Sequence, residues 1–210
     1  MIFINAHTHH LEKDENILSI YQATPLDAQL SSPFSISIHP WDIGKGFTMA
    51  DVESKIHCKT CIAVGETGLD KLRPDYKEQI RFFIQHIQLA KAYKKPLIIH
   101  CVKAFDDCIA ILKKEKFNGG VLFHGFNKHP QLALQLLKHG YFIGLGASFL
   151  KENHNFDRFL QEIELNQILF ETDNQTDVSI LDLYSRAQQL FPNLDVKQKM
   201  SNNFKNWKEK

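Results

Sequence analysis

The sequence predicts an α/β fold, a single compact TIM-like (β/α)8 barrel that spans residues 1–210. Eight short apolar segments of the kind that forms buried strands recur along the chain. From the fourth segment onward, amphipathic helical patterns separate these segments, as in repeated βα units. Histidines or carboxylates follow most of the segments, at the strand ends that meet on one face of a barrel. An open doubly wound sheet is the alternative that periodicity leaves open.

The first four predicted strands are rich in β-branched or aromatic residues. They cover residues 2–5, 17–21, 34–38 and 61–65. Only about thirty residues separate His10 from His39, and this stretch must contain two βα units. We therefore expect reduced helices in the first two βα units, followed by a short helix over residues 50–57.

The second part of the chain alternates strands and helices regularly. Apolar strands are expected at residues 97–99, 121–123, 141–143 and 168–170. Helical spacing of apolar residues predicts helices within residues 76–90, 105–112, 132–137, 156–163, 183–190 and 196–207. Asp75 followed by Glu78 resembles a capping box, and Pro130 suits the first turn of a helix.

The composition limits the classes of function. Lys and Arg total 25 and Asp and Glu total 24, which gives a formal net charge of only +1. This balance argues against a broad basic surface that wraps long duplex DNA by charge alone, but it permits a pocket for one strand end. The chain has no apolar run of membrane-spanning length and no pattern of a secretion signal, and its four cysteines form no disulfide framework. We expect a cytoplasmic protein that does not associate with membranes, and the sequence indicates no protein partner.

Chemically versatile side chains stand at the ends of the predicted strands. His7 and His9 alternate at the end of the first strand, so they share one face and form a bidentate metal-binding pair. Comparable residues follow the third, fourth, fifth, sixth and eighth strands: His39, Glu66, His100, His124 and Asp173. Singly, each has an ordinary alternative as a core histidine, a turn residue or a helix-capping carboxylate. Together, on one rim of a barrel, they predict a metal centre.

Six stretches around these strand ends carry a family resemblance. They are Asn5-Ala6-His7-Thr8-His9, Ser37-Ile38-His39-Pro40, Val64-Gly65-Glu66-Thr67-Gly68-Leu69-Asp70, Ile98-Ile99-His100, Phe123-His124-Gly125-Phe126 and Glu171-Thr172-Asp173. Their order and coverage resemble those of the TatD-type metal-dependent hydrolases of the amidohydrolase superfamily. The resemblance implies a TIM-like barrel with a one- or two-metal centre, and an activity that in this family is mostly metal-dependent DNase action.

The resemblance implies six metal ligands in two groups that share one carboxylate. The first group is His7, His9, Glu66 and Asp173, and the second is Glu66, His100 and His124. The chemistry is consistent with this, because two divalent ions about 4 Å apart require a bridging carboxylate. Imidazole and carboxylate ligands together suit one or two zinc, manganese or magnesium ions. Glu66 and Asp173 are the predicted catalytic residues, and Asp173 is expected to accept a proton from the attacking water.

The sequence departs from the family pattern at several positions. Asn5 stands where the family usually has Asp, and Cys101-Val102 stand where it commonly has Ser-Arg. An arginine there would suit phosphate contact, so Lys103 is the predicted substitute, and His39 is the second predicted substrate contact. The proline-rich segment that often follows the last ligand in the family is replaced by residues 174–177.

The favoured function is a metal-dependent hydrolase of phosphodiester bonds, a deoxyribonuclease that uses a metal-activated water. One alternative is a hydrolase of a small phosphoester, amide or lactone on the same metal centre. The other is a catalytically silent binding or scaffold barrel. The presence of all six ligand residues favours an enzyme, and turnover separates the two classes.

Overall fold

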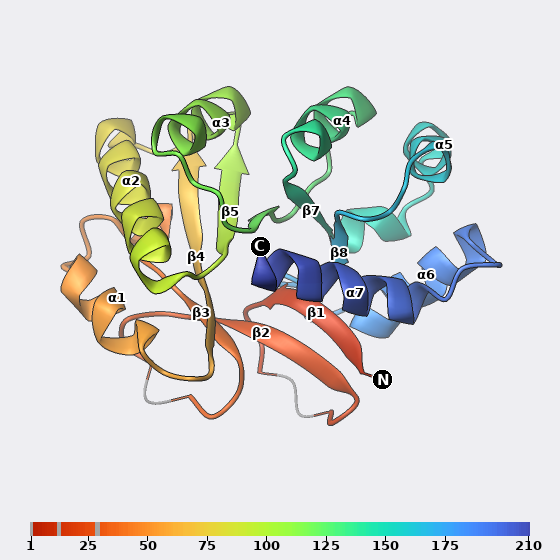
Figure 1. The fold of residues 1–210 in the computed structure, drawn as a ribbon, viewed down its shortest axis with the longest axis horizontal. Coiled ribbons are helices and arrows are strands. Elements are labelled where there is room, and N and C mark those ends of the chain that lie inside the picture. Colours follow the sequence, from red (N-terminus) through yellow and green to blue (C-terminus); the bar gives the residue numbers. More distant parts are fainter. Residues whose placement is uncertain (1, 12–13, 28–29) are drawn as a thin grey trace.

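Eight parallel strands succeed one another in chain order around the core of the computed structural model, which describes residues 2–11, 14–27 and 30–210 (Figure 1). They are β1 (Phe3–Thr8), β2 (Ile17–Ala23), β3 (Phe34–Ile36), β4 (Cys61–Asp70), β5 (Leu97–Val102), β6 (Val121–Phe123), β7 (Phe142–Leu145) and β8 (Ile168–Phe170). Each strand pairs with the next in parallel register. Because the strands are parallel, their carboxyl ends all lie on one face of the barrel, which is the face where active sites form in this fold.

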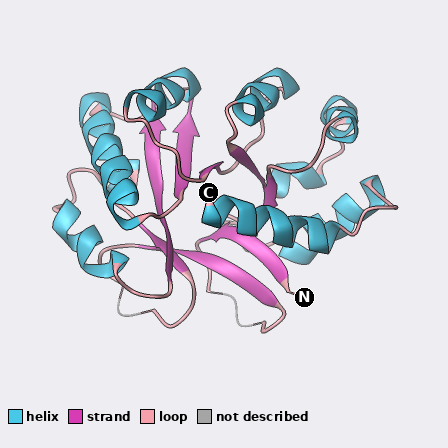
Figure 2. Ribbon diagram, viewed as in Figure 1, coloured by secondary structure: helices cyan, strands magenta, loops and turns pink. Residues whose placement is uncertain are grey.

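The helices lie outside the strands, as Figure 2 shows. They are α1 (Met49–Ile56), α2 (Tyr76–Tyr93), α3 (Phe105–Lys114), α4 (Pro130–Lys138), α5 (His154–Glu162), α6 (Ile180–Leu190) and α7 (Val196–Glu209), with short 3-10 helices η1 (Pro40–Asp42) and η2 (Ala147–Leu150). The described residues between β1 and β2, and between β2 and β3, contain no helix. The predicted reduction of the first two βα units is thus confirmed. Within the described residues, no helix combines the length and the apolar character needed to cross a membrane.

Hydrogen bonds between β1 and the segment after β8 bring the two ends of the sheet together. The His9 amide donates to the Asp173 carbonyl at 2.9 Å, and the Thr172 amide donates to the His7 carbonyl at 3.2 Å. The side chain of Asn5 donates to Thr172 Oγ1 at 2.9 Å and accepts from the Thr172 amide at 3.1 Å. The structure is therefore a nearly closed barrel and not an open doubly wound sheet, and Asn5 contributes to its closure.

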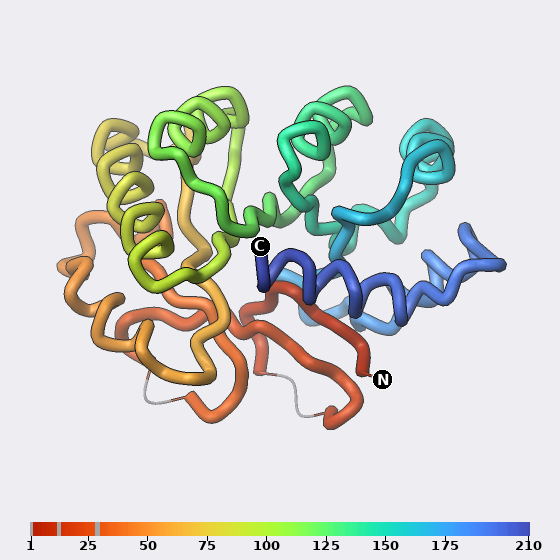
Figure 3. The backbone as a smooth tube through the Cα atoms, viewed as in Figure 1, coloured from red at the N-terminus to blue at the C-terminus, as the bar shows by residue number. Residues whose placement is uncertain are grey.

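The last helix covers the end of the barrel opposite the predicted metal centre. Figure 3 shows the C-terminal segment beside the N-terminal strand, and Trp207 and Phe204 of α7 pack against inward-facing residues of the strands. These inward-facing residues are Ile4, Ala6, Ile20, Ala63, Ile98, Leu122, Phe142 and Leu169. Gly120 allows this close approach, because a Cβ atom there would overlap the Trp207 carbonyl.

Two local features differ from the prediction. Strand β4 does not stop at Glu66 but continues to Asp70, with a shift of register against β5 between Val64 and Thr67. The capping box at Asp75 was a wrong prediction. Asp75 has a left-handed backbone with φ of 58°, whereas a capping side chain requires an extended residue, and it makes no capping hydrogen bond. The predicted position of Pro130 in the first turn of α4 is confirmed.

His86 of α2 links the helix to the strand-end segment that carries His39. Its Nδ1–H donates to the Phe82 carbonyl at 2.7 Å, and its Nε2 accepts from the Ile38 amide at 3.0 Å. Burial lowers the pKa of His86 to about 4, although the hydrogen bond to Phe82 partly offsets this effect. Nε2 can accept from the Ile38 amide only when it carries no proton, so His86 is neutral in the folded protein at pH 7.

Acidification is therefore expected to destabilise the fold through His86. The unfolded chain takes up a proton near pH 6.5 and the folded chain only near pH 4, so stability is lost as the pH falls through this interval. The full effect is about 3 kcal/mol. Urea denaturation at pH 7.5, 5.5 and 4.5 measures it, with His86→Gln as the control that removes the titrating group. Equal pH dependence in both proteins would contradict this assignment.

Candidate metal centre

The structure brings the predicted ligand residues together at the carboxyl ends of the strands. The six predicted ligands are His7, His9, Glu66, His100, His124 and Asp173, and the predicted substrate contact His39 lies among them. Glu66 lies at the middle of them, and its side chain is only 3% exposed. Its two carboxylate oxygens face two different groups of side chains.

The first group surrounds Oε2 of Glu66. The Nε2 atoms of His7 and His9 lie 3.1 and 3.2 Å from this oxygen. Asp173 Oδ1 lies 3.5 Å from each of the same two nitrogens. His7 belongs to β1 and His9 follows its last residue, and both rings face Glu66, as their alternation predicts. Asp173 reaches them because its backbone is bonded to this segment. These four side chains can enclose one ion.

The second group surrounds Oε1 of Glu66. His100 Nδ1 lies 2.6 Å away, His124 Nε2 lies 2.7 Å away and His39 Nε2 lies 3.1 Å away. The nitrogens of His39 and His124 are 3.3 and 3.4 Å from His100 Nδ1. One carboxylate thus presents one oxygen to each group, which is the arrangement that a bridging ligand requires.

The charges of the centre favour a cation. Burial by itself favours the neutral form of Glu66, but the neighbouring imidazoles, His124 first among them, hold the pKa of Glu66 well below its usual range. Burial lowers the pKa of His7, yet the carboxylates of Asp173 and Glu66 more than offset this and raise it to about 9. The carboxylates therefore favour positive charge on the imidazoles. A divalent ion bound between these side chains would supply the same positive charge.

Unpartnered atoms show that the residues fit such an ion. In the described part of the chain, the ring nitrogens of His7 are fully buried and make no hydrogen bond, although Nε2 points at two carboxylates. Buried polar atoms ordinarily have partners, and a nitrogen facing carboxylates in this way is a typical metal ligand. Mixed imidazole and carboxylate donors suit zinc, manganese or magnesium.

His39 differs from the other histidines in its hydrogen bonding. Its Nδ1 accepts a hydrogen bond from the Trp41 amide at 3.0 Å, so in the neutral ring the proton resides on Nε2. Burial lowers the pKa of His39, and Glu66 only partly offsets this effect. A neutral His39 therefore presents an Nε2–H donor to the cavity. This tautomer agrees with the predicted role of a substrate contact, although His39 also lies close enough to Glu66 and His100 for the three to hold one ion.

Two carboxylates lie behind the predicted ligands and place negative charge beside their rings. Glu171 is fully buried, with Oε1 3.5 Å from His124 Nδ1, and it accepts a hydrogen bond from the Gly125 amide. Asp70 Oδ2 lies 3.7 Å from His100 Nε2 and accepts from Trp41 Nε1 at 2.9 Å. A carboxylate behind a histidine fixes its tautomer and leaves the other nitrogen free for the metal.

Asp70 and Glu171 belong to the strand-end motifs, but the sequence indicates no role for them. The sequence also gives no prediction of the side chains that hydrogen-bond to the Glu66 backbone. Ser37 Oγ donates to the Glu66 carbonyl at 2.6 Å, and the Gln22 side chain accepts from the Glu66 amide. The available signal was a polar residue in each of two short apolar strands. That signal is weak, because strands commonly alternate polar and apolar residues.

Glu171→Gln is expected to weaken metal binding at the second group by ~10- to 100-fold, because the neutral amide no longer places a negative charge beside the His124 ring. Competition with a chromophoric chelator measures the affinity. Glu164→Gln, at an exposed position before β8, is the control. Unchanged affinity in Glu171→Gln would contradict the orienting role.

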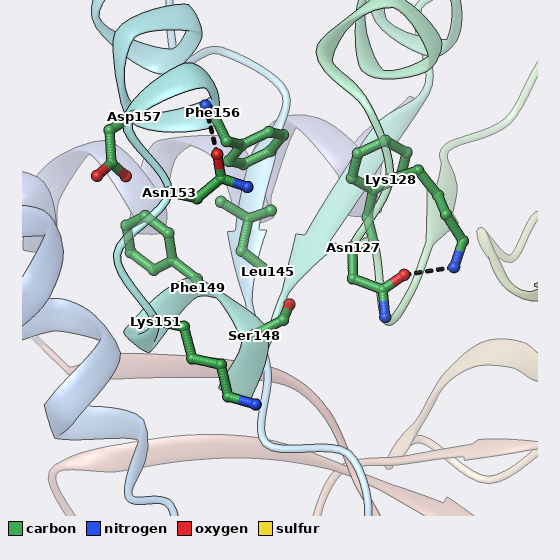
Figure 4. Close-up of a pocket in the computed structure, with 10 residues that line it drawn as sticks. Asn127, Lys128, Leu145, Ser148, Phe149, Lys151, Asn153, Phe156 and Asp157 are labelled. Atoms are coloured by element: carbon green, nitrogen blue, oxygen red, sulfur yellow. Dashed lines mark hydrogen bonds between the residues drawn. The ribbon is translucent and has the colours of Figure 1, made fainter.

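Most of the predicted ligand residues line a cavity of about 360 Å³. Lys45 lines it, and Trp41 stands half-exposed at its mouth. Lys103 is exposed after β5 and is not among the lining residues. A smaller hollow on the same face lies between the segments that follow β6 and β7 (Figure 4). Figure 4 shows Lys128 and Lys151 on its two sides, so cations border the site on this flank as well.

The chain matches the sequence profile of the TatD related DNase family over residues 7–180. This match covers well over half of the chain, and the protein therefore belongs to that family. The membership agrees with the resemblance seen in the strand-end motifs.

Relatives and solved structures support the same conclusion. The chain is 33% identical over 146 residues to YcfH of Escherichia coli K12, an uncharacterized metal-dependent hydrolase, covering 67% of this chain and 55% of the relative. An uncharacterized metal-dependent hydrolase of Buchnera aphidicola is 33% identical over 154 residues, 67% of this chain and 58% of the relative. The chain thus spans a little over half the length of these curated relatives. The crystal structure of YJJV, a TatD homologue from Escherichia coli K12, shares the fold with a TM-score of 0.76 and 21% identity over 99% of this chain and 98% of that one.

Proposed function

We propose that the protein is a metal-dependent hydrolase that cleaves phosphodiester bonds, with DNA ends as its substrate. The observation that carries the proposal is the position of Glu66, whose two oxygens each face a separate set of ligand side chains. Divalent ions held there would supply Lewis acidity, which lowers the pKa of water and neutralises charge on a phosphoryl group. The family description as a DNase supports the choice of substrate.

Asp173 is the candidate for the proton acceptor. Burial raises the pKa of its carboxyl, but the neighbouring imidazoles of His7 and His124 outweigh this and lower it. The carboxylate is therefore ionised at neutral pH. Its side chain is 36% exposed and lines the cavity, so it can reach a water molecule there and accept its proton.

His39 and Lys45 are the candidates for holding the phosphate. The Nε2–H of His39 lies 3.1 Å from its acceptor Glu66 Oε1 at the wall of the cavity, and a phosphate oxygen bound beside Glu66 would be a second acceptor within its reach. Lys45 lines the same cavity from the loop after η1 and is paired with Asp42 at 2.6 Å. Together they would position a phosphate in the second group's half of the site.

Hydrolysis of end-labelled single- and double-stranded DNA tests the proposal. The protein is stripped of metal and restored with magnesium, manganese or zinc before the assay. Cleavage that depends on added metal supports the deoxyribonuclease function. Metal-dependent hydrolysis of bis(p-nitrophenyl) phosphate without any DNA cleavage would overturn the DNA assignment and would indicate that the substrate is a small phosphoester. No hydrolysis of either substrate would leave a binding or scaffold barrel.

The lysines of Figure 4 provide a prediction about substrate length. Lys128 and Lys151 are exposed on the metal face and are expected to contact phosphates of a strand beyond the scissile bond. Lys128→Gln combined with Lys151→Gln should raise KM for a 20-nucleotide strand and reduce the slope of log KM against log salt by about 1.5. Hydrolysis of bis(p-nitrophenyl) phosphate should stay unchanged. An equal loss with both substrates would contradict the contact.

A further inference from the structure

Six lysines line a cavity on the face of the barrel opposite the metal centre. The cavity measures about 400 Å³ and lies where the segments entering β5 and β6 meet the C-terminal end of α7. Its lysines are Lys91, Lys94, Lys95, Lys116, Lys208 and Lys210, and Glu209 is the one acidic residue in its lining. A chain whose formal net charge is only +1 thus concentrates positive charge at this place.

Part of this lysine cluster offsets the partial negative charge at the C-terminal ends of helices. The C-terminal ends of α2, α3 and α7 converge here, and lysines offset the partial negative charge of such ends. Lys91, Lys95 and Lys210 each donate a hydrogen bond to a backbone carbonyl, at 2.7, 2.7 and 2.6 Å. These three ammonium groups are therefore already engaged.

The other three lysines are free to take a ligand. Within the described residues, Lys94, Lys116 and Lys208 are exposed and form no salt bridge or side-chain hydrogen bond. Lys94 and Lys116 also both adopt a left-handed backbone, with φ of 51° at each. Glycine or asparagine is the usual residue where a helix ends in this conformation. Lysine therefore occupies two positions beside the cavity where the left-handed backbone favours glycine or asparagine.

The floor of the cavity is apolar. Pro96 and Phe117 contribute to it, above the fully buried Ala90. A Cβ atom at Gly119 would overlap the Phe117 ring, so the ring, which is 9% exposed, lies directly against the backbone. The volume falls within the range of small-molecule sites. An apolar floor with free ammonium groups at its edge matches a ligand that joins a flat ring to a chain of phosphates.

We propose that this cavity binds a nucleoside polyphosphate, with its base on the floor and its phosphates on Lys94, Lys116 and Lys208. The site is separate from the metal centre, because the two cavities share no lining residue. The proposal does not depend on the nature of the substrate hydrolysed at the metal face.

Binding of a fluorescent N-methylanthraniloyl derivative of ATP tests the proposal. The titration uses the full chain in EDTA at low salt, so that phosphate binding through metal ions is suppressed. The combined variant Lys94→Gln, Lys116→Gln and Lys208→Gln should raise Kd by ~10-fold or more. The matched control Lys113→Gln, Lys114→Gln and Lys205→Gln removes the same charge from exposed positions of α3 and α7 outside the cavity. This control should keep the wild-type Kd, and circular dichroism confirms that both variants fold.

Competition experiments identify the ligand class. ATP and ADP should displace the probe, whereas adenosine and inorganic phosphate should not. Absence of saturable binding, or equal weakening in the two lysine variants, would overturn the site. Displacement by tripolyphosphate as effective as that by ATP would overturn the contact with a base. Stronger displacement by a single-stranded oligonucleotide would overturn the nucleotide assignment in favour of nucleic acid.

Discussion

Glu66→Gln is expected to abolish metal retention at both groups of ligands and to lower kcat/KM for phosphodiester hydrolysis by ~10³-fold or more. Oε2 of Glu66 lies within 3.2 Å of two imidazole nitrogens, and Oε1 lies within 3.1 Å of three. Glutamine offers one neutral oxygen and turns an amide nitrogen toward the other group. Neither set of imidazoles would then share a negative charge, and divalent ions would bind weakly to both.

Metal content after dialysis and kcat/KM on end-labelled DNA measure this prediction together. Glu152→Gln is the matched control, since it makes the same substitution at an exposed position after η2. Thermal unfolding followed by circular dichroism shows whether the variant is folded. A folded Glu66→Gln protein that retained its metal and its activity would exclude a bridging role for this carboxylate.

Asp173→Asn is expected to lower kcat by ~10²- to 10⁴-fold, the range that a positioned proton acceptor supplies. The carboxylate of Asp173 lies 3.5 Å from the Nε2 atoms of His7 and His9 and is ionised at neutral pH. Asparagine keeps an oxygen in this place but cannot accept the proton. The metal held by the second group, which lacks Asp173, should remain.

The kcat of the variant and its metal stoichiometry separate these effects. Asp177→Asn changes an exposed residue four positions along the same segment and should behave like the wild type. A normal kcat in Asp173→Asn would assign the proton transfer to another group. Loss of all metal would show that Asp173 acts mainly as a ligand.

Much of the site could be predicted because it depends on strand periodicity. Alternation places His7 and His9 on one face of β1, and closure of a parallel barrel brings strand ends from distant parts of the sequence to one rim. The reduced helices of the first two βα units followed from chain length alone. The structure therefore places Glu66 and the five predicted ligands around it as the motifs indicate.

The remaining features depend on contacts that no local pattern encodes. Glu171 after β8 lies beside His124 after β6, with β7 between the two strands. Gly144 of β7 leaves the room that Glu171 needs, since a Cβ atom there would overlap its carboxylate. The donor tautomer of His39 is set by the amide of Trp41 in η1, a turn that the sequence did not predict. The backbone of Asp75 is left-handed because of the path between β4 and α2, which overrides the capping preference of aspartate.

The location of bound ions tests the central claim most directly. Crystals of the protein soaked in manganese and measured for anomalous scattering would reveal the ions and their ligands. Two anomalous peaks are predicted, one between Glu66 Oε2 and the histidines of β1, and one between Glu66 Oε1 and His100 with His124. A manganese peak that does not involve Glu66, or no peak among these residues, would contradict the account.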